Sequence, residues 1–139
     1  MRLFLDANIL FSAAHSDHGH AYHLVRLAEA DYCVLLSSRH ALDEAGRNLE
    51  LKSQGFQDRF ARIKDRMETV PEAPAELTHW AGARGLPAKD APVLAAAVHA
   101  NADLLVTGDV RDFGPLFGNA FRGVRVTTLA DAVDLVLAQ

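Results

Sequence analysis

Two short apolar runs of this sequence each lead into an acidic residue. Arg2–Leu5 is followed by Asp6, with Asn8 two positions later. Residues 103–107 are followed, after one glycine, by Asp109. Short apolar runs suit buried strands, and open α/β sheets bind ligands at the carboxyl ends of their strands. Both acids are therefore expected in position for chemistry, although Asp is also a favoured helix N-cap and Asp6 could serve that purpose instead.

A third acid, Asp90, lies near the start of a helix predicted over residues 89–101. Val93, Leu94 and Ala97 follow it by three, four and seven residues and so share its face. The helix dipole favours a carboxylate at this end by about 0.3–1 kcal/mol. An acid that satisfies backbone N–H groups is the structural alternative. That alternative leaves unexplained why the acid shares a face with buried residues, where an unpaired charge is costly.

A fourth acid comes from the helix predicted over residues 38–52, with Ser37 or Ser38 as its cap. The apolar stripe of this helix consists of Ala41, Leu42, Ala45 and Leu49. Asp43 and Glu44 both lie beside the stripe. Helix geometry favours Glu44, which is nearer the edge of the stripe, without excluding Asp43.

These acids form a predicted constellation whose members are Asp6, Glu44, Asp90, Asp109 and Asp112. Carboxylates gathered at one place repel one another unless they bind cations or share protons. Oxygen ligands suit Mg²⁺ or Mn²⁺. Magnesium held by carboxylates serves phosphate chemistry, including in-line displacement at phosphorus. The sequence therefore predicts a divalent-metal site that acts on a phosphate ester.

Polar and basic residues stand next to these acids in the sequence. Asn8 and Thr107 are candidates to orient the metal ligands or a water molecule. Lys89 precedes the constellation's third acid, and Arg111 lies within the last acidic turn. Both cations are candidate phosphate contacts, and a solvated surface position is the alternative for each.

The elements that must position these residues alternate between strand and helix. Strands are predicted at residues 2–5, 32–37, 103–107 and 124–127, and helices at 20–30, 38–52, 55–68, 76–83, 89–101 and 129–137, with one helical turn at 11–14. Such alternation implies a mostly parallel sheet covered on both faces. A length of 139 residues suits a single α/β domain over residues 1–139.

Two further groups of side chains have competing interpretations. The helix at 55–68 has an apolar face, made of Phe56, Phe60, Ile63 and Met67, and beside it a basic stripe, made of Arg59, Arg62 and Arg66. The stripe is either solvated or contacts phosphate or a partner. The histidines His15, His18, His20 and His23 are either a transition-metal site or a solvated loop entering a helix. Their spacing fits no zinc pattern and no cysteine supports them, which favours the loop.

Composition restricts the remaining possibilities. The one cysteine, Cys33, excludes an internal disulfide and a Cys-rich zinc site, and we expect a buried thiol. No apolar run reaches membrane-spanning length, and Asp6 and Asn8 interrupt any signal peptide, so a cytoplasmic protein without a membrane commitment is expected. The net charge of −4 argues against a nucleic-acid partner, but removing the five acids of the constellation leaves +1. Net charge therefore does not decide the partner.

Four segments together resemble the motifs of the PIN domain family. They are Leu5–Leu10, the acid Glu44, Lys89–Ala97 and Leu105–Phe113, in the family's order and spacing over nearly the whole chain. The resemblance implies a three-layer α/β/α sandwich. It also implies that Asp6, Glu44, Asp90 and Asp109 are catalytic and, together with Asp112, bind Mg²⁺ or Mn²⁺. Asn8 and Thr107 match the family's supporting polar positions.

The resemblance further implies a nuclease that cleaves RNA. Small stand-alone members are often VapC-type toxins, dimeric and neutralised by a small antitoxin protein, so an RNA substrate, an antitoxin and a homodimer are the expected partners. A housekeeping RNA-processing nuclease and a non-catalytic domain that binds RNA or protein are the alternatives. A HAD-type phosphatase also begins with a strand that ends in Asp, but Asn8 stands where that chemistry requires a second Asp.

Overall fold

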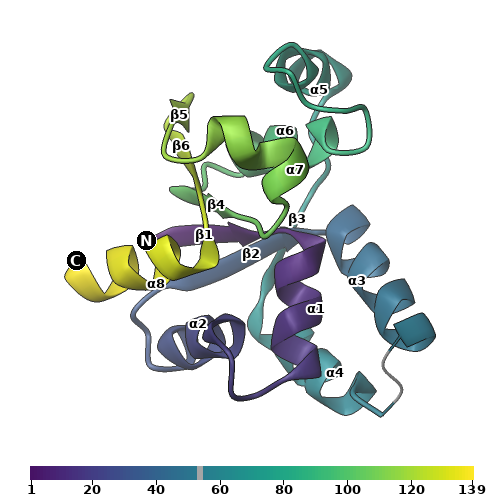
Figure 1. The fold of residues 1–139 in the computed structure, drawn as a ribbon, viewed down its shortest axis with the longest axis vertical. Helices are drawn as coiled ribbons and strands as arrows, with labels where there is room; N and C mark the ends of the chain where they lie inside the picture. The colour runs from purple at the N-terminus through teal and green to yellow at the C-terminus, as the bar shows by residue number, and fades with distance from the viewer. Residues whose placement is uncertain (53–54) are drawn as a thin grey trace.

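The computed structural model describes residues 1–52 and 55–139. Within them, six strands form one sheet in the order β3-β2-β1-β4-β6-β5 (Figure 1). The strands are β1 (Arg2–Leu5), β2 (Val34–Ser38), β3 (Glu68–Val70), β4 (Leu104–Val106), β5 (Ala120–Phe121) and β6 (Val124–Thr127). All neighbouring strands are parallel except the β5–β6 hairpin. The predicted mostly parallel sheet is confirmed.

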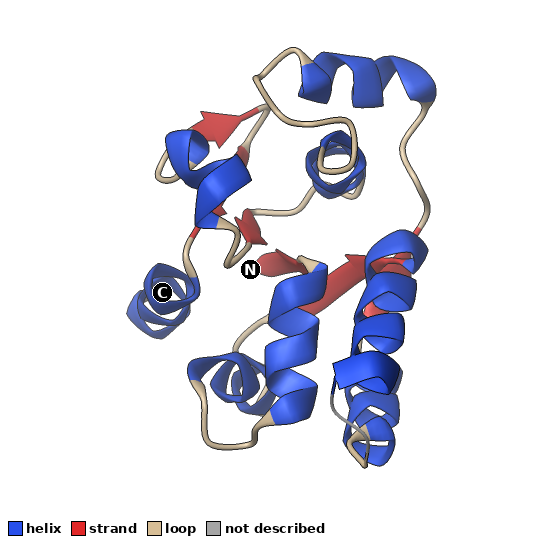
Figure 2. Cartoon of the chain, turned by 45° about the vertical axis from the view of Figure 1, so that its right-hand side comes forward, coloured by secondary structure: helices blue, strands red, loops and turns tan. Residues whose placement is uncertain are grey.

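Helices cover both faces of the sheet, as Figure 2 shows. One face packs against α1 (Ala7–His15), α2 (His20–Glu29), α3 (Arg39–Lys52), α4 (Gln57–Arg66) and α8 (Leu129–Ala138). The other packs against α5 (Ala75–Gly82), α6 (Ala91–His99), α7 (Val110–Phe113) and the 3₁₀ turn η1 (Gly114–Leu116). The predicted three-layer α/β/α sandwich is therefore present.

The central strand shows why the sequence folds in this way. Leu3 and Leu5 of β1 point into the core beneath α1, whereas Phe4 points into the core beneath α6. Successive strand residues face opposite sides, so an uninterrupted apolar run is buried on both. β1 pairs with β2 on one side and β4 on the other, and Leu3 is opposite Leu35 and Leu104. This places the carboxyl ends of β1 and β4 side by side.

The sequence analysis predicted the first helix too short and two other helices too long. Helix α1 begins directly at Ala7, not at 11, because the Asp6 side chain accepts the Ala7 N–H. Helix α4 ends at Arg66 because the chain turns extended at Met67 to form β3, a strand the sequence analysis missed. Helix α6 begins only at Ala91, so Asp90 is its N-cap instead of a first-turn residue.

Other expectations hold or change in detail. Ser38 is the cap of α3, since its hydroxyl accepts the Ala41 N–H at 3.2 Å. Cys33 is a buried thiol, as expected. Leu137, predicted on the apolar face of the last helix, is instead 56% exposed. Nowhere in the described chain is a helix long and apolar enough to span a membrane.

The structure gives two arginines of the basic stripe on α4 a structural role and also bears on the histidine-rich loop. Arg59 donates to the Ala14 carbonyl at 3.0 Å and pairs with Asp17. Arg66 donates to the Ala28 carbonyl at 2.6 Å and forms an ion pair with Asp31, which follows α2. Both arginines therefore fasten α4 to its neighbours. The only group spaced to hold a metal in the described residues contains no histidine, in keeping with the loop interpretation.

Candidate active site

The carboxylate of Asp6 is held by the protein at the carboxyl end of β1. It is 5% exposed and accepts the Ala7 N–H at 2.8 Å, the Thr107 hydroxyl at 2.8 Å and the Asn8 amide at 3.3 Å. Burial raises the pKa of Asp6, the charges of Glu44 and Asp109 raise it further, and the bonds from Thr107 and Ala7 oppose the rise. Asp6 thus caps α1, and its place beside Glu44 and Asp109 is compatible with the prediction that it also acts in the site.

Asn8 and Thr107 join the ends of β1 and β4. The Asn8 amide oxygen accepts the Gly108 N–H at 2.8 Å, and its nitrogen faces Asp6 and, at 3.4 Å, the Thr107 hydroxyl. That hydroxyl also accepts the Asp109 N–H at 3.1 Å. Every polar atom of this bridge is engaged, so it fixes both acids relative to each other. Asn8 and Thr107 thus link Asp6 to Asp109 through hydrogen bonds, and their role in orienting metal ligands stays a prediction.

Asp90 differs from Asp6 because it has almost no bonded support. It is 7% exposed, yet its side chain caps no backbone N–H of α6. Its Oδ2 accepts no hydrogen bond from any residue that the structure describes. Burial, followed by the hydrogen bond with Asp112, raises the pKa of Asp90 to about 6. The helix-capping explanation of this acid is therefore wrong, and an unsatisfied buried oxygen is left facing the site.

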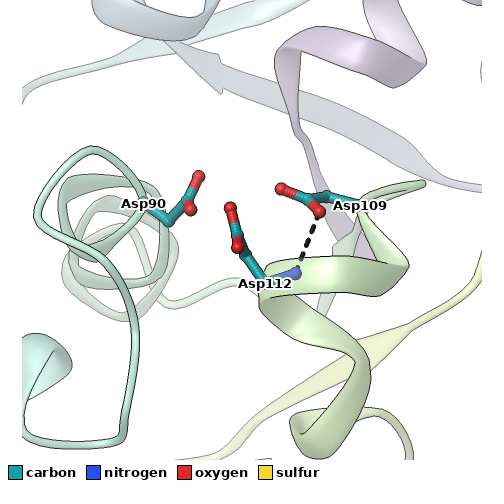
Figure 3. A group of neighbouring side chains, drawn as sticks. All are labelled: Asp90, Asp109 and Asp112. Atoms are coloured by element: carbon teal, nitrogen blue, oxygen red, sulfur yellow. Dashed lines mark hydrogen bonds between the residues drawn. The ribbon is translucent and has the colours of Figure 1, made fainter.

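Asp109 and Asp112 come from the turn that enters α7. The Asp109 carboxylate accepts the Asp112 N–H at 3.0 Å and caps this short helix. One oxygen each of Asp90, Asp109 and Asp112 lies within 4.8 Å of the others. Figure 3 shows the three carboxylates converging from α6 and α7 on one space. Residues from two separate segments thus form a compact acidic cluster.

Glu44 lines a small cavity that its neighbour Asp43 does not line. The cavity has a volume of about 110 Å³ and is lined by Asp6, Ala7, Asn8, Glu44, Asn48, Lys89, Asp90 and Asp109. Asp43 instead lines a different hollow, with Lys64 and Thr69. The packing of α3 therefore directs Glu44 to the acids at the strand ends. Asn48 is a lining residue that the sequence analysis missed, and its spacing of four residues from Glu44 was the available signal.

Lys89 is engaged with the acids themselves. Its ammonium lies 2.9 Å from an Asp112 oxygen and 3.4 Å from Asp90 Oδ2. The hydrogen bond with Asp112 raises the pKa of Lys89, and the same bond lowers the pKa of Asp112. Arg111 is exposed on α7. The two candidate phosphate contacts thus differ: one neutralises the acidic cluster, and the other faces solvent.

The donor set fits a hard divalent cation. The ligands available are carboxylate oxygens, the type that Mg²⁺ and Mn²⁺ prefer. Asp90 Oδ2 is buried without a hydrogen-bond partner in the described chain, as expected of an oxygen reserved for a cation. The three carboxylates of the cluster lie close enough for one ion to contact all of them.

A parallel α/β sandwich with acids at the ends of its central strands defines a known class of protein. The model of the PIN domain family matches residues 2–111, and the chain belongs to this family. The assignment leaves no support for a HAD-type phosphatase, and the Asn8 amide, bonded on both sides, carries no acidic proton for that chemistry.

Solved structures share this fold. VapBC2 from Rickettsia felis, bound to a DNA fragment from its promoter, is 20% identical, with 92% of this chain and 98% of that chain covered and a TM-score of 0.65. PAE2754 from Pyrobaculum aerophilum is 18% identical, with 100% and 91% covered and a TM-score of 0.69. VapC20 from Mycobacterium tuberculosis, a sarcin–ricin loop cleaving toxin, is 17% identical, with 85% and 96% covered and a TM-score of 0.59. Comparison with curated proteins found no match.

Proposed function

We propose that this chain is a divalent-metal-dependent endoribonuclease that hydrolyses phosphodiester bonds of RNA. The observation that carries the proposal is the convergence of four acids from separate elements on one cavity: Asp6 after β1, Glu44 on α3, Asp90 before α6 and Asp109 before α7. Four carboxylates that face one another are unfavourable without a cation. Membership of the PIN domain family supports the same conclusion.

Asp6, Glu44, Asp90, Asp109 and Asp112 would hold Mg²⁺ or Mn²⁺, and the oxygens of Asp90, Asp109 and Asp112 are the ones that lie within 4.8 Å of one another. When bound, such an ion activates water and stabilises the charge that develops at phosphorus. The protein's own contribution is placement. The hydroxyl of Thr107 fixes the orientation of the Asp6 carboxylate. Asp90, whose Oδ2 accepts no hydrogen bond from the described residues, lines the same cavity.

The test is cleavage of end-labelled total RNA by the purified protein in Mg²⁺, in Mn²⁺ and in EDTA. We expect discrete fragments with either metal and none in EDTA. Asp6→Ala and Asp90→Ala should abolish cleavage with circular dichroism spectra unchanged. Metal-independent cleavage, or full activity in both variants, would contradict the proposal.

Helix α3 offers a matched pair of variants for the same assay. Glu44→Ala removes an acid that lines the cavity, whereas Asp43→Ala removes an adjacent acid that lies outside it. Cleavage should fall strongly in the first and stay at the level of the unaltered protein in the second. Equal losses would show that the overall negative charge of α3, not the position of Glu44, matters.

We further propose that the nuclease is the toxin of a VapBC-type pair, acting in the cytoplasm as a homodimer neutralised by a small antitoxin. The support is the shared fold with VapBC2 and VapC20. Expression of the chain alone should arrest growth, and coexpression of the small reading frame next to its gene should relieve the arrest and copurify. Growth without arrest would favour a housekeeping nuclease. Light scattering would measure the oligomeric state.

A further inference from the structure

The only tryptophan of the chain, Trp80 on α5, lies beneath two arginines. Its ring packs against the core on the α6 side of the sheet and remains partly exposed. The Arg84 guanidinium lies 5.4 Å from the ring centroid and the Arg122 guanidinium lies 4.2 Å from it. Both distances are within the range of cation–π contacts. Trp80 therefore holds together two charges from segments 38 residues apart in the sequence.

Neither arginine forms an ion pair with an acid that the structure describes. Three other arginines do so: Arg2 with Glu68, Arg59 with Asp17 and Arg66 with Asp31. Both guanidinium groups contact one ring, and neither has a carboxylate partner among the described residues. Their charge is therefore available to an anion. Guanidinium groups recognise phosphate oxygens through paired hydrogen bonds, so a phosphate is the anion that best fits this arrangement.

The backbone at Arg122 strengthens this interpretation. Phe121 pairs with Val124, so Arg122 and Gly123 alone form the turn of the β5–β6 hairpin, with φ values of 50° and 87°. Turns with two positive φ values favour Asn, Asp or Gly at the first position. A non-glycine residue in such a conformation is strained, and strain of this kind gathers at functional positions. The turn thus holds an arginine where an asparagine would be more stable.

Both arginines lie on segments that are joined in the chain to acids of the site. Arg84 lies in the connection between α5 and α6 that leads to Asp90. The hairpin that carries Arg122 follows α7, which contains Asp112. In Figure 2 the hairpin approaches the C-terminal end of α5.

We propose that Arg84 and Arg122, held over Trp80, bind the phosphodiester backbone of single-stranded RNA outside the acidic cavity. This inference rests on the proposed ribonuclease function and identifies a second point of contact with its substrate. Basic side chains on an aromatic platform bind single strands without sequence preference. The contact should therefore raise affinity for RNA and leave the choice of cleavage site unchanged.

The experiment uses the fluorescence of Trp80, which no other tryptophan obscures. The full chain is titrated with a 12-nucleotide single-stranded RNA in EDTA, where cleavage is not expected. Fluorescence should change on binding. Arg84→Ala and Arg122→Asn should each weaken binding about three- to tenfold and lower the salt dependence by about one charge.

Arg122→Asn also excludes misfolding as a cause, since asparagine suits the positive φ and should keep or raise the melting temperature. Arg125→Ala is the matched control: it removes an exposed arginine from β6 that has no contact with Trp80 among the described residues. Wild-type affinity in Arg84→Ala and Arg122→Asn, or an equal loss in Arg125→Ala, would overturn the proposal. A response to polyglutamate but not to RNA would also overturn it and indicate an acidic protein partner.

The two proposals fail in distinguishable ways. RNA binding that depends on Arg122 but is never followed by cleavage in Mg²⁺ or Mn²⁺ would support the RNA contact and contradict the ribonuclease. Metal-dependent cleavage with a KM that is unchanged in Arg122→Asn would support the ribonuclease and contradict the contact. A higher KM with unchanged kcat in Arg122→Asn is the expected result.

Discussion

The acidic site has two halves that are built differently. On the β1 side, Asp6 is held by two side chains and a backbone N–H, and each donor has its own fixed position. On the α6 side, Asp90 has a buried oxygen without a hydrogen bond from the described residues, and the ammonium of Lys89 is its nearest positive charge. Both acids are similarly buried. They differ in what stabilises the negative charge.

This difference indicates how the protein accommodates its buried acids. Hydrogen bonds replace part of the water that the Asp6 carboxylate has lost, although burial still raises its pKa. Asp90 and Asp112 are not so supplied, and each depends on the other and on Lys89. A divalent cation would therefore stabilise the α6 side of the site far more than the β1 side. One half is therefore pre-organised, and a bound ion would complete the other.

The largest expected contrast is in stability without metal. Asp6→Ala should lower the free energy of unfolding by about 1–3 kcal/mol, because the Ala7 N–H and the Thr107 hydroxyl lose their partner. Asp90→Ala should destabilise the fold less, because the Asp90 Oδ2 has no hydrogen bond from the described residues and Lys89, its ion-pair partner, keeps Asp112. Urea unfolding in EDTA measures both. Equal destabilisation would show that the two halves do not differ.

A variant that removes the Thr107 hydrogen bond to Asp6 and keeps the acid tests the β1 side of the site by itself. Thr107→Val should reduce metal affinity and cleavage by about 10–100-fold, as loss of a group that orients a metal ligand usually does. Thr127→Val is the control, since Thr127 is also buried, on the adjacent strand β6, and its hydroxyl has no partner among the described residues. Calorimetric Mn²⁺ titration should find Thr127→Val unchanged, and a comparable loss there would point to general packing.

Replacing Lys89, the cation on the α6 side of the site, should change Mn²⁺ affinity less than Thr107→Val does, and in the opposite direction. Lys89→Met should tighten Mn²⁺ binding about five- to tenfold, because the ion no longer competes with an ammonium beside Asp90 and Asp112. The same variant should be less stable than the unaltered protein in EDTA. Weaker Mn²⁺ binding would instead mean that Lys89 positions Asp112 as a ligand.

The last contrast concerns pH. The folded-state pKa of Asp90, about 6, lies above its usual value, so its protonation stabilises the fold at low pH and that contribution is lost as pH rises from about 4 to 7. After discounting for solvent screening we expect a loss of about 1–2 kcal/mol. Asp112, whose pKa is lowered, acts in the opposite sense and only below about pH 4.

Asp90→Asn is the variant that isolates this pH effect. It should flatten the dependence of unfolding free energy on pH between 4 and 7 in EDTA. Addition of Mn²⁺ at pH 7 should restore stability to the unaltered protein and not to Asp90→Asn. An unchanged pH profile in the variant would assign the effect to another carboxyl, with Asp6 the first to examine.

Much of the fold could be predicted because its signals are local. The apolar runs of β1, β2, β4 and β6 are visible in the sequence, and so are the amphipathic helices. The strand β3 was missed because two of its three residues are polar and exposed, and β5 because two residues carry too little pattern. The early start of α1 depends on the Asp6 cap, which the sequence analysis held open only as an alternative.

The sequence by itself determined which residue types stand at the ends of the parallel strands. Asp6, Thr107 and Asp109 follow strands directly, so the chain's local geometry delivers them to one edge of the sheet. Tertiary structure decided the rest. Helix geometry in the sequence favoured Glu44 and left Asp43 open, and the packing of the buried residues of α3 against α1 brings Glu44 and not Asp43 to the cavity. Lys89 meets Asp112 only because α6 and α7 begin side by side, and a contact between side chains 23 residues apart leaves no periodic trace in a sequence.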